Sequence, residues 1–148
     1  MEVYVDLDWA GSAIDRKSTS GCYFSMGSGV ISWFSRKQYC VALSTSEVEY
    51  VTACSASCEG VWLRKLLSGL FDLQLYATSI YCDNHICVKL TENPVFHDKS
   101  KHIEIKYHYI RDMVQGGAMK LQYVVTNEQT TNMLTKPLAT VKFKYFRC

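Results

Sequence analysis

Two aspartates lie two positions apart in the first hydrophobic segment of the chain. In residues 2–9, apolar residues at odd positions alternate with polar or aromatic residues at even positions. This period of two predicts a β-strand with Asp6 and Asp8 on one face. Two neighbouring carboxylates concentrate negative charge and attract a cation. The alternative is that Asp8 begins a turn and Asp6 is only solvated.

A second candidate site residue follows a later strand. Residues 78–82 have the apolar character of a buried strand, and Asp83 and Asn84 come directly after it. Sites in sheets with parallel strands form beyond the carboxyl ends of those strands. We therefore expect Asp6 and Asp83 to lie at the same edge of a sheet.

The remaining elements predict one α/β domain covering residues 1–148. A loop over 11–21 precedes a predicted hairpin with strands at 22–26 and 30–35, and Ser44 and Glu47 have the spacing of a capping box that opens a helix reaching Leu70. Further expected elements are a short helix before Pro94, a helix over 103–114, a strand over 119–125 and a terminal helix from 127–129. This order predicts a five-stranded mixed sheet, with its first three strands antiparallel and helices on its faces.

Composition narrows the classes of protein that fit. The chain has 148 residues, a formal net charge of +2 and no apolar run long enough to cross a bilayer. No signal peptide is visible, and seven scattered cysteines are typical of a reduced intracellular protein. We expect a monomer in the cytoplasm or nucleus, without a membrane partner.

Seven sequence blocks in order resemble the ribonuclease H domain of copia-type LTR retrotransposon Pol polyproteins. The blocks are DLDWAG at 6–11, RKSTSG at 16–21, ISW at 31–33 with RKQ at 36–38, STSEVEY at 44–50, CDN at 82–84, NPVFH at 93–97 with KHIE at 101–104, and LTKPL at 134–138. They span nearly the whole chain. The resemblance implies a ribonuclease H-like fold whose acids hold two divalent metals against an RNA strand paired to DNA.

The acids that this resemblance assigns are Asp6, Glu49 and Asp83. Glu47 is the alternative second acid, but we favour Glu49 because Glu47 already occupies the capping position. The implied cofactor is Mg²⁺, two ions, with Mn²⁺ as a substitute. Two such ions activate a water and stabilise the leaving oxygen in phosphodiester hydrolysis.

Asn132 departs from the family pattern, which has Asp at this place. An amide oxygen can ligate a hard cation but adds no charge. We therefore expect Asn132 to be a weak fourth catalytic and metal ligand, with weaker binding of one ion and slower turnover. A change of register that recruits Glu128 is the alternative.

Contacts to a nucleic acid are expected from polar and basic residues around these acids. Ser44, Thr45 and Asn84 are candidates for 2′-hydroxyl contacts, and Arg36, Lys37, Lys99, Lys101 and Lys136 for phosphate contacts. His97, His102 and His108 are expected to contact substrate or to pack, with proton transfer as the alternative. A zinc site at Cys82, His85 and Cys87 is disfavoured because no fourth ligand is evident.

The sequence thus predicts a metal-dependent endonuclease that cuts the RNA strand of RNA–DNA hybrids, with activity reduced by Asn132. The alternative is a catalytically impaired module, adopted by a host, that binds nucleic acid or protein.

Overall fold

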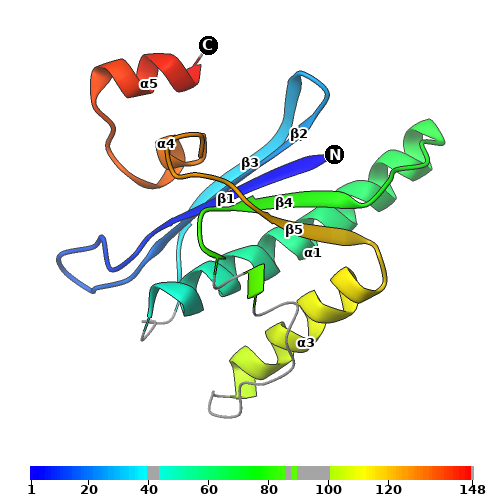
Figure 1. Cartoon of the computed structure of the whole chain (residues 1–148), viewed down its shortest axis with the longest axis horizontal. Coiled ribbons are helices and arrows are strands. Elements are labelled where there is room, and N and C mark those ends of the chain that lie inside the picture. Colours follow the sequence, from blue (N-terminus) through cyan, green and yellow to red (C-terminus); the bar gives the residue numbers. More distant parts are fainter. Residues whose placement is uncertain (40–43, 86–87, 90–100, 148) are drawn as a thin grey trace.

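A five-stranded mixed sheet forms the centre of the molecule (Figure 1). The computed structural model describes residues 1–39, 44–85, 88–89 and 101–147. Its strands, in the spatial order β3-β2-β1-β4-β5, are β1 (Glu2–Asp8), β2 (Thr19–Met26), β3 (Gly29–Lys37), β4 (Thr78–Cys82) and β5 (Met119–Tyr123). The first three strands pair antiparallel, while β4 is parallel to β1 and β5 is parallel to β4. The predicted mixed sheet is confirmed.

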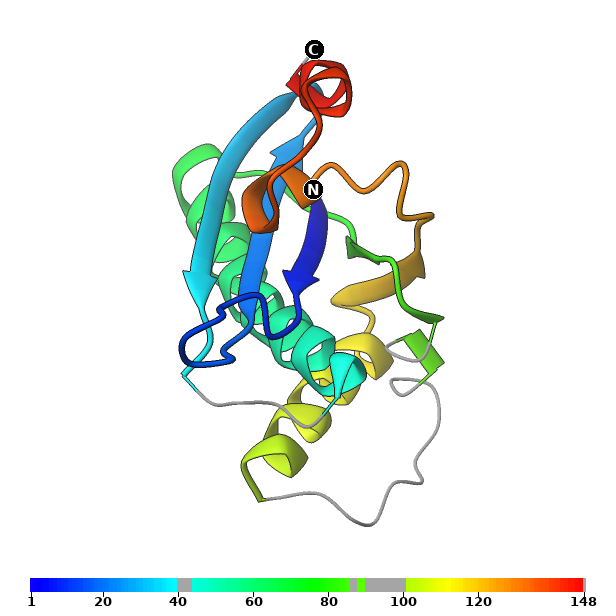
Figure 2. The ribbon, with the colours of Figure 1, turned by 90° about the vertical axis from the view of Figure 1, so that its left-hand side faces the viewer.

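Helices cover the two faces of the sheet unequally. The described helices are α1 (Thr45–Phe71), α3 (Lys101–Gln115), α4 (Asn132–Thr135) and α5 (Thr140–Arg147). The long α1 packs on one face together with α3, and the short α4 lies on the opposite face (Figure 2). Alternation along the strands explains this division, because Val3, Val5 and Ile80 project into the core beneath α1. Asp6 projects to the α4 face.

Helix α1 forms where the capping box predicts it. The hydroxyl of Ser44 accepts a hydrogen bond from the Glu47 backbone N–H, 3.3 Å away, which satisfies one of the free donors at the helix start. Ala53, Ala56 and Gly60 are buried on the face toward the sheet, and their small size allows close approach. The helix therefore carries its N-terminal residues to the edge where β1 and β4 end.

The predicted helix from 127–129 is wrong. Residues 126–131 form successive turns, and the helix that follows, α4, is only four residues long. Two causes limit it. Lys136 precedes Pro137 and is extended at φ −136° and ψ 151°, as the residue before a proline usually is. Upstream, the side chain of Gln129 is directed at the sheet, so this segment is held by tertiary contacts.

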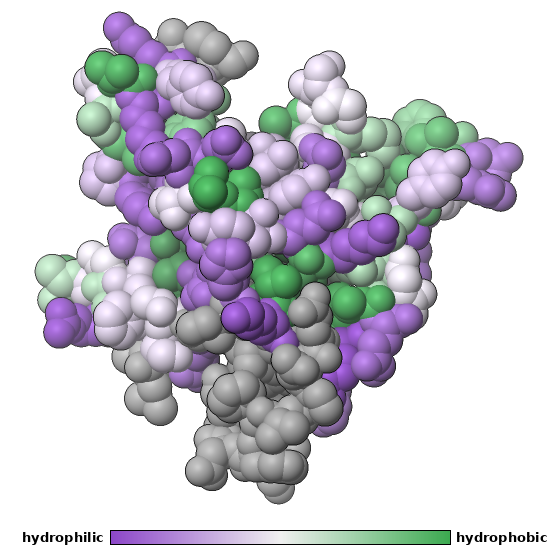
Figure 3. Space-filling view, viewed as in Figure 1, coloured by the Kyte–Doolittle hydropathy of each residue, from purple (hydrophilic) through white to green (hydrophobic). Residues whose placement is uncertain are grey.

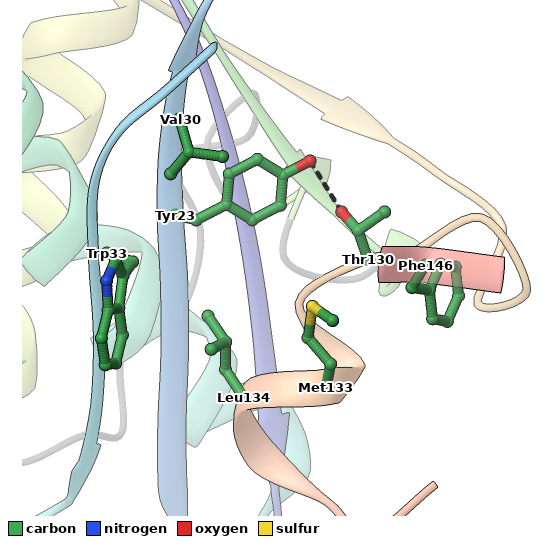
Figure 4. Close-up of a pocket in the computed structure, with 7 residues that line it drawn as sticks. All are labelled: Tyr23, Val30, Trp33, Thr130, Met133, Leu134 and Phe146. Atoms are coloured by element: carbon green, nitrogen blue, oxygen red, sulfur yellow. Dashed lines mark hydrogen bonds between the residues drawn. The ribbon is translucent and has the colours of Figure 1, made fainter. Parts of the chain in front are cut away.

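The α4 face carries aromatic side chains. Tyr4 stacks between Tyr23 and Tyr81, with ring centroids 4.9 and 4.7 Å apart. Tyr23 also lines a pocket of about 290 Å³ and accepts a hydrogen bond from Thr130 at 2.7 Å (Figure 4). On the face shown in Figure 3, hydrophobic residues form separate small patches among hydrophilic ones. None of the helices within the described ranges has the length and hydrophobicity needed to span a bilayer.

Candidate active site

Asp6 occupies the buried centre of the candidate site. It lies near the end of β1, and its side chain is only 2% exposed. Thr135 donates a hydrogen bond to Oδ2, and the ammonium of Lys136 lies 3.5 Å from Oδ1. Burial raises the pKa of Asp6 above its usual value, against the opposing effects of Thr135 and Lys136. The carboxylate is therefore held by two residues at the end of α4.

Asp83 lies directly after β4, at the same edge of the sheet. Thr126 donates a hydrogen bond to its Oδ2 at 3.1 Å. The charge of Asp83 contributes to the raised pKa values of both Asp6 and Glu49, so the three carboxyl groups act on one another. Beside Asp83, the exposed ring of His85 stacks on Tyr123 with centroids 3.6 Å apart. Asp6 and Asp83 thus lie near the ends of neighbouring parallel strands, and their charges act on one another.

Glu49 is contributed by the beginning of α1. Burial is the main cause that raises its pKa to about 8, with further increases from Asp83 and Asp6. A hydrogen bond with Asn84 acts in the opposite direction, as does the charge of Lys136. Its Oε2 is buried and has no hydrogen-bond partner. A buried, unpaired carboxylate oxygen facing two other acids is the kind of group that a bound cation would satisfy.

Asn132 is buried beside this cluster, and its side chain hydrogen-bonds to the local backbone. Both of its amide hydrogen bonds run to carbonyl oxygens, at 2.7 Å to Gln129 and 3.1 Å to Thr126. The amide therefore caps the turn that leads into α4. Whether its oxygen also ligates an ion stays a prediction, as does the alternative of Glu128, whose side chain is exposed.

The residues predicted to contact nucleic acid have varied surroundings. Lys136 pairs with Asp6 instead of projecting outward. Arg36 lies 4.1 Å from the centre of the Phe34 ring, and Lys37 pairs with Asp15 at 3.5 Å. Ser44 caps α1, and Asn84 bonds to Glu49.

Two other residues predicted to contact nucleic acid, Thr45 and Lys101, lie in helices α1 and α3. Thr45 is exposed at the start of α1, and Lys101 is the first residue of α3. His102 and His108 also lie in α3, where His108 is exposed. Lys99, His97 and Cys87 lie outside the described residues.

The described side chains of the site have the chemistry of ligands for a divalent metal, but they are not arranged as a ready-made site. Within the described ranges, no three Asp, Glu, His or Cys side chains form a ready-made metal site. Asp6 bonds to Thr135 and Lys136, while Asp83 bonds to Thr126. The chemistry nevertheless fits a hard cation, because three mutually repelling carboxyl groups include an unpaired buried oxygen on Glu49. The residues that would hold it are Asp6, Glu49 and Asp83.

Three residues of this site were missed by reasoning from the sequence. Thr126, Gln129 and Thr135 bond to site carboxylates or to the strands that carry them. Thr135 belongs to a block that carries the family resemblance, which was the available signal. Thr126 and Gln129 lie in a segment without regular periodicity, so no pattern indicated where their side chains point.

The fold and these carboxyl groups define a class of protein, which comparisons with known proteins identify. No family model matches the chain. Among solved structures, LC11-RNase H1 in complex with an RNA/DNA hybrid superposes with a TM-score of 0.62 at 12% identity, covering 90% of this chain and 92% of that one. The chain therefore has the ribonuclease H fold.

Sequence relatives specify the origin of this domain. The chain is 40% identical over 141 residues to the retrovirus-related Pol polyprotein from transposon TNT 1-94 of Nicotiana tabacum, covering 95% of this chain. It is 42% identical over 146 residues to the Pol polyprotein from transposon RE2 of Arabidopsis thaliana, covering 99%. The chain spans about 10% of the length of these curated relatives. It is homologous to a segment of retrotransposon Pol polyproteins, which confirms the resemblance found in its sequence.

Proposed function

We propose that this chain is a metal-dependent endonuclease that cleaves the RNA strand of RNA–DNA hybrids. The observation that carries the proposal is the unpaired, buried Oε2 of Glu49 in a cluster with Asp6 and Asp83. Burial, together with repulsion from Asp83 and Asp6, raises the pKa of Glu49 to about 8, and a bound divalent cation would lower it again. The fold, the homology to Pol polyproteins and the hybrid seen with one structural neighbour all support this proposal.

The chain's own residues would perform three tasks in this reaction. Asp6, Glu49 and Asp83 would hold Mg²⁺, or Mn²⁺ in its place, which supplies the charge that activates water and stabilises the leaving oxygen. Thr126 and Thr135 orient Asp83 and Asp6 by direct hydrogen bonds. Asn84 holds Glu49 by a side-chain hydrogen bond.

The charge of the site limits how many ions it would hold. Three carboxylates and the ammonium of Lys136 leave two negative charges, enough to balance one divalent ion. Asn132 adds none, and its amide hydrogens are engaged with the backbone. A second ion would require Lys136 to leave Asp6. We therefore propose that one ion binds more weakly than the other and that turnover is slow.

Cleavage of an end-labelled RNA–DNA hybrid tests the proposal, with single-stranded RNA and duplex RNA as control substrates. Activity is expected only on the hybrid and only with Mg²⁺ or Mn²⁺, and Asp6→Asn should abolish it. Asp8→Asn is the matched control, since Asp8 lies on the same strand two residues away. Full cleavage by Asp6→Asn with excess metal would contradict the proposal.

A second function is favoured by the surroundings of Asp6. The ion pair with Lys136 and the neutral Asn132 would suit a module that binds hybrids without cutting them. Tight hybrid binding with no cleavage by the parent in either metal would support this binding module. Hybrid-specific cleavage would exclude it.

A further inference from the structure

The carboxyl ends of β1 and β4 separate just before they reach the two aspartates. These parallel strands pair from Glu2 opposite Ser79 to Tyr4 opposite Tyr81. Continuing the same register by two residues would place Asp6 opposite Asp83. The pairing ends before that point, so the backbone ladder between β1 and β4 does not by itself fix how far apart the two aspartates lie.

The side chain of Gln129 lies where this ladder ends. Its Nε2 donates hydrogen bonds to the carbonyl oxygen of Val5 at 2.7 Å and to that of Tyr81 at 3.4 Å. The first carbonyl belongs to the peptide bond that joins Val5 to Asp6, and the second lies two residues before Asp83. One amide group therefore bridges the two strands at the position that precedes both aspartates.

The burial of Gln129 adds a second, independent observation. The residue is fully buried, and its Oε1 has no hydrogen-bond partner. An unsatisfied buried polar atom costs about 1–3 kcal/mol and calls for an explanation. An apolar side chain of similar shape would remove that cost but would leave the carbonyl oxygens of Val5 and Tyr81 without this donor, so the glutamine is explained by its bonds to the two strands.

We propose that Gln129 is a positioning residue that sets the separation of Asp6 and Asp83 by bridging the backbones of β1 and β4. The amide lets the strands part while keeping their ends tied, and so leaves the two carboxylates spaced for a cation between them. The role of this spacing in cation binding rests on the proposed function. The bridge itself is a feature of the fold and can be tested without any cleavage.

Gln129→Met tests the bridge, because methionine keeps the length of the side chain and removes both hydrogen bonds. Thr131→Val is the matched control: Thr131 is equally buried two residues away, and its hydroxyl has no partner. If Gln129→Met does not fold, Gln129→Asn keeps the amide and shortens its reach by one methylene. The parent, Gln129→Met and Thr131→Val are compared by crystal structure, by Mn²⁺ titration calorimetry and by hybrid cleavage.

The expected result is a change in the Asp6 to Asp83 Cα separation in Gln129→Met and none in Thr131→Val. Mn²⁺ affinity should fall roughly 10- to 100-fold, as for other residues that orient metal ligands, with kcat falling alongside and KM for the hybrid unchanged. An unchanged separation overturns the inference. A changed separation with unchanged Mn²⁺ affinity also overturns it, because the spacing would then have no role in cation binding.

The crystal structures keep this test separate from that of the proposed function. A parent protein that binds no Mn²⁺ and cuts no hybrid would refute the nuclease and, with it, the purpose given to the spacing. The bridge would still be supported by a separation that changes only in Gln129→Met.

Discussion

The ammonium of Lys136 lies 3.5 Å from Oδ1 of Asp6, a carboxylate that is almost completely withdrawn from solvent. An ion pair with one buried partner is costly to break from one side, since the remaining charge stays unpaired. The pair also places a positive charge beside an acid proposed to bind a divalent ion. Lys136 and the metal therefore compete for the same carboxylate.

Lys136→Met should raise metal affinity and lower stability in metal-free buffer. We expect Mn²⁺ affinity to rise about fivefold, equivalent to about 1 kcal/mol for a pair whose lysine is partly exposed. Isothermal titration and thermal unfolding with and without Mn²⁺ measure both effects. Lys37→Met is the control, because Lys37 forms an ion pair of the same length with the exposed Asp15. Equal Mn²⁺ affinity in the parent and Lys136→Met would contradict competition.

Asn132→Asp should destabilise the metal-free protein. A carboxylate would replace an amide that donates to two backbone carbonyls, and it would meet their oxygens without hydrogens to share. The expected loss is about 1–3 kcal/mol, measured by urea unfolding in EDTA. Mg²⁺ should restore more stability to this variant than to the parent, since the added charge favours a second ion.

The control for Asn132→Asp is Asn127→Asp, the same chemical change at an exposed position of the same segment. It should leave stability and Mg²⁺ response near those of the parent. If Asn132→Asp were as stable as the parent in EDTA, the hydrogen bonds from the Asn132 side chain to Thr126 and Gln129 would not contribute to stability. In that case Asn132 would not be a cap for this turn.

The two aspartates of the site were predictable from local pattern, whereas their partners were not. Asp6 follows from a period of two, and Asp83 from its place after a buried strand. Glu49 needed the resemblance as well, because a capping box explains Glu47 but does not choose the metal ligand. The positions of these three acids are fixed by the strand or helix in which each lies, and a strand or helix can be predicted from its local sequence.

The hydrogen-bond partners depend on contacts between distant parts of the chain. Thr135 is 129 residues from Asp6, and Thr126 is 43 residues from Asp83. The segment that contains them forms turns where the sequence predicted a helix, since Gln129 bonds to the sheet and Pro137 stops α4. Tertiary contacts determine the conformation of this segment, and the periodicity of its sequence does not reveal those contacts.

Glu49→Gln should make stability less dependent on pH. The pKa of Glu49 rises from 4.5 to about 8 on folding, so the folded state favours the protonated acid. Its contribution is fully present below about pH 4.5 and is lost as pH rises through about 8. Because the group is only partly shielded from solvent, we expect a gain of about 2 kcal/mol for Glu49→Gln at pH 9 and none at pH 4.

Urea unfolding across this pH range in EDTA measures the effect of Glu49→Gln. Glu47→Gln serves as the control, since Glu47 is the alternative second acid and lies in the same turn of α1. The loss of stability with rising pH should persist in Glu47→Gln. If that variant flattened the pH dependence and Glu49→Gln did not, Glu47 would be the acid that faces Asp83.

Gly21→Ala should displace α4 from the sheet and disturb Asp6. Gly21 is paired with Asp6 across β1 and β2, and a Cβ there would lie 2.6 Å from Cγ2 of Thr135 and 3.1 Å from Cβ of Leu134. Thr135 cannot easily turn away, because its hydroxyl bonds to Asp6. We expect a loss of about 1–3 kcal/mol, typical of overpacking, measured by urea unfolding.

Thr135→Ser in the Gly21→Ala background separates crowding from other effects of the new methyl group. Serine keeps the hydroxyl for Asp6 and lacks Cγ2, so the double variant should recover most of the lost stability. Gly69→Ala is the control for glycine replacement, since nothing lies within 4 Å of the added Cβ and alanine favours the helix. Failure of Thr135→Ser to recover stability would mean that α4 and β2 do not approach as closely as Gly21 permits.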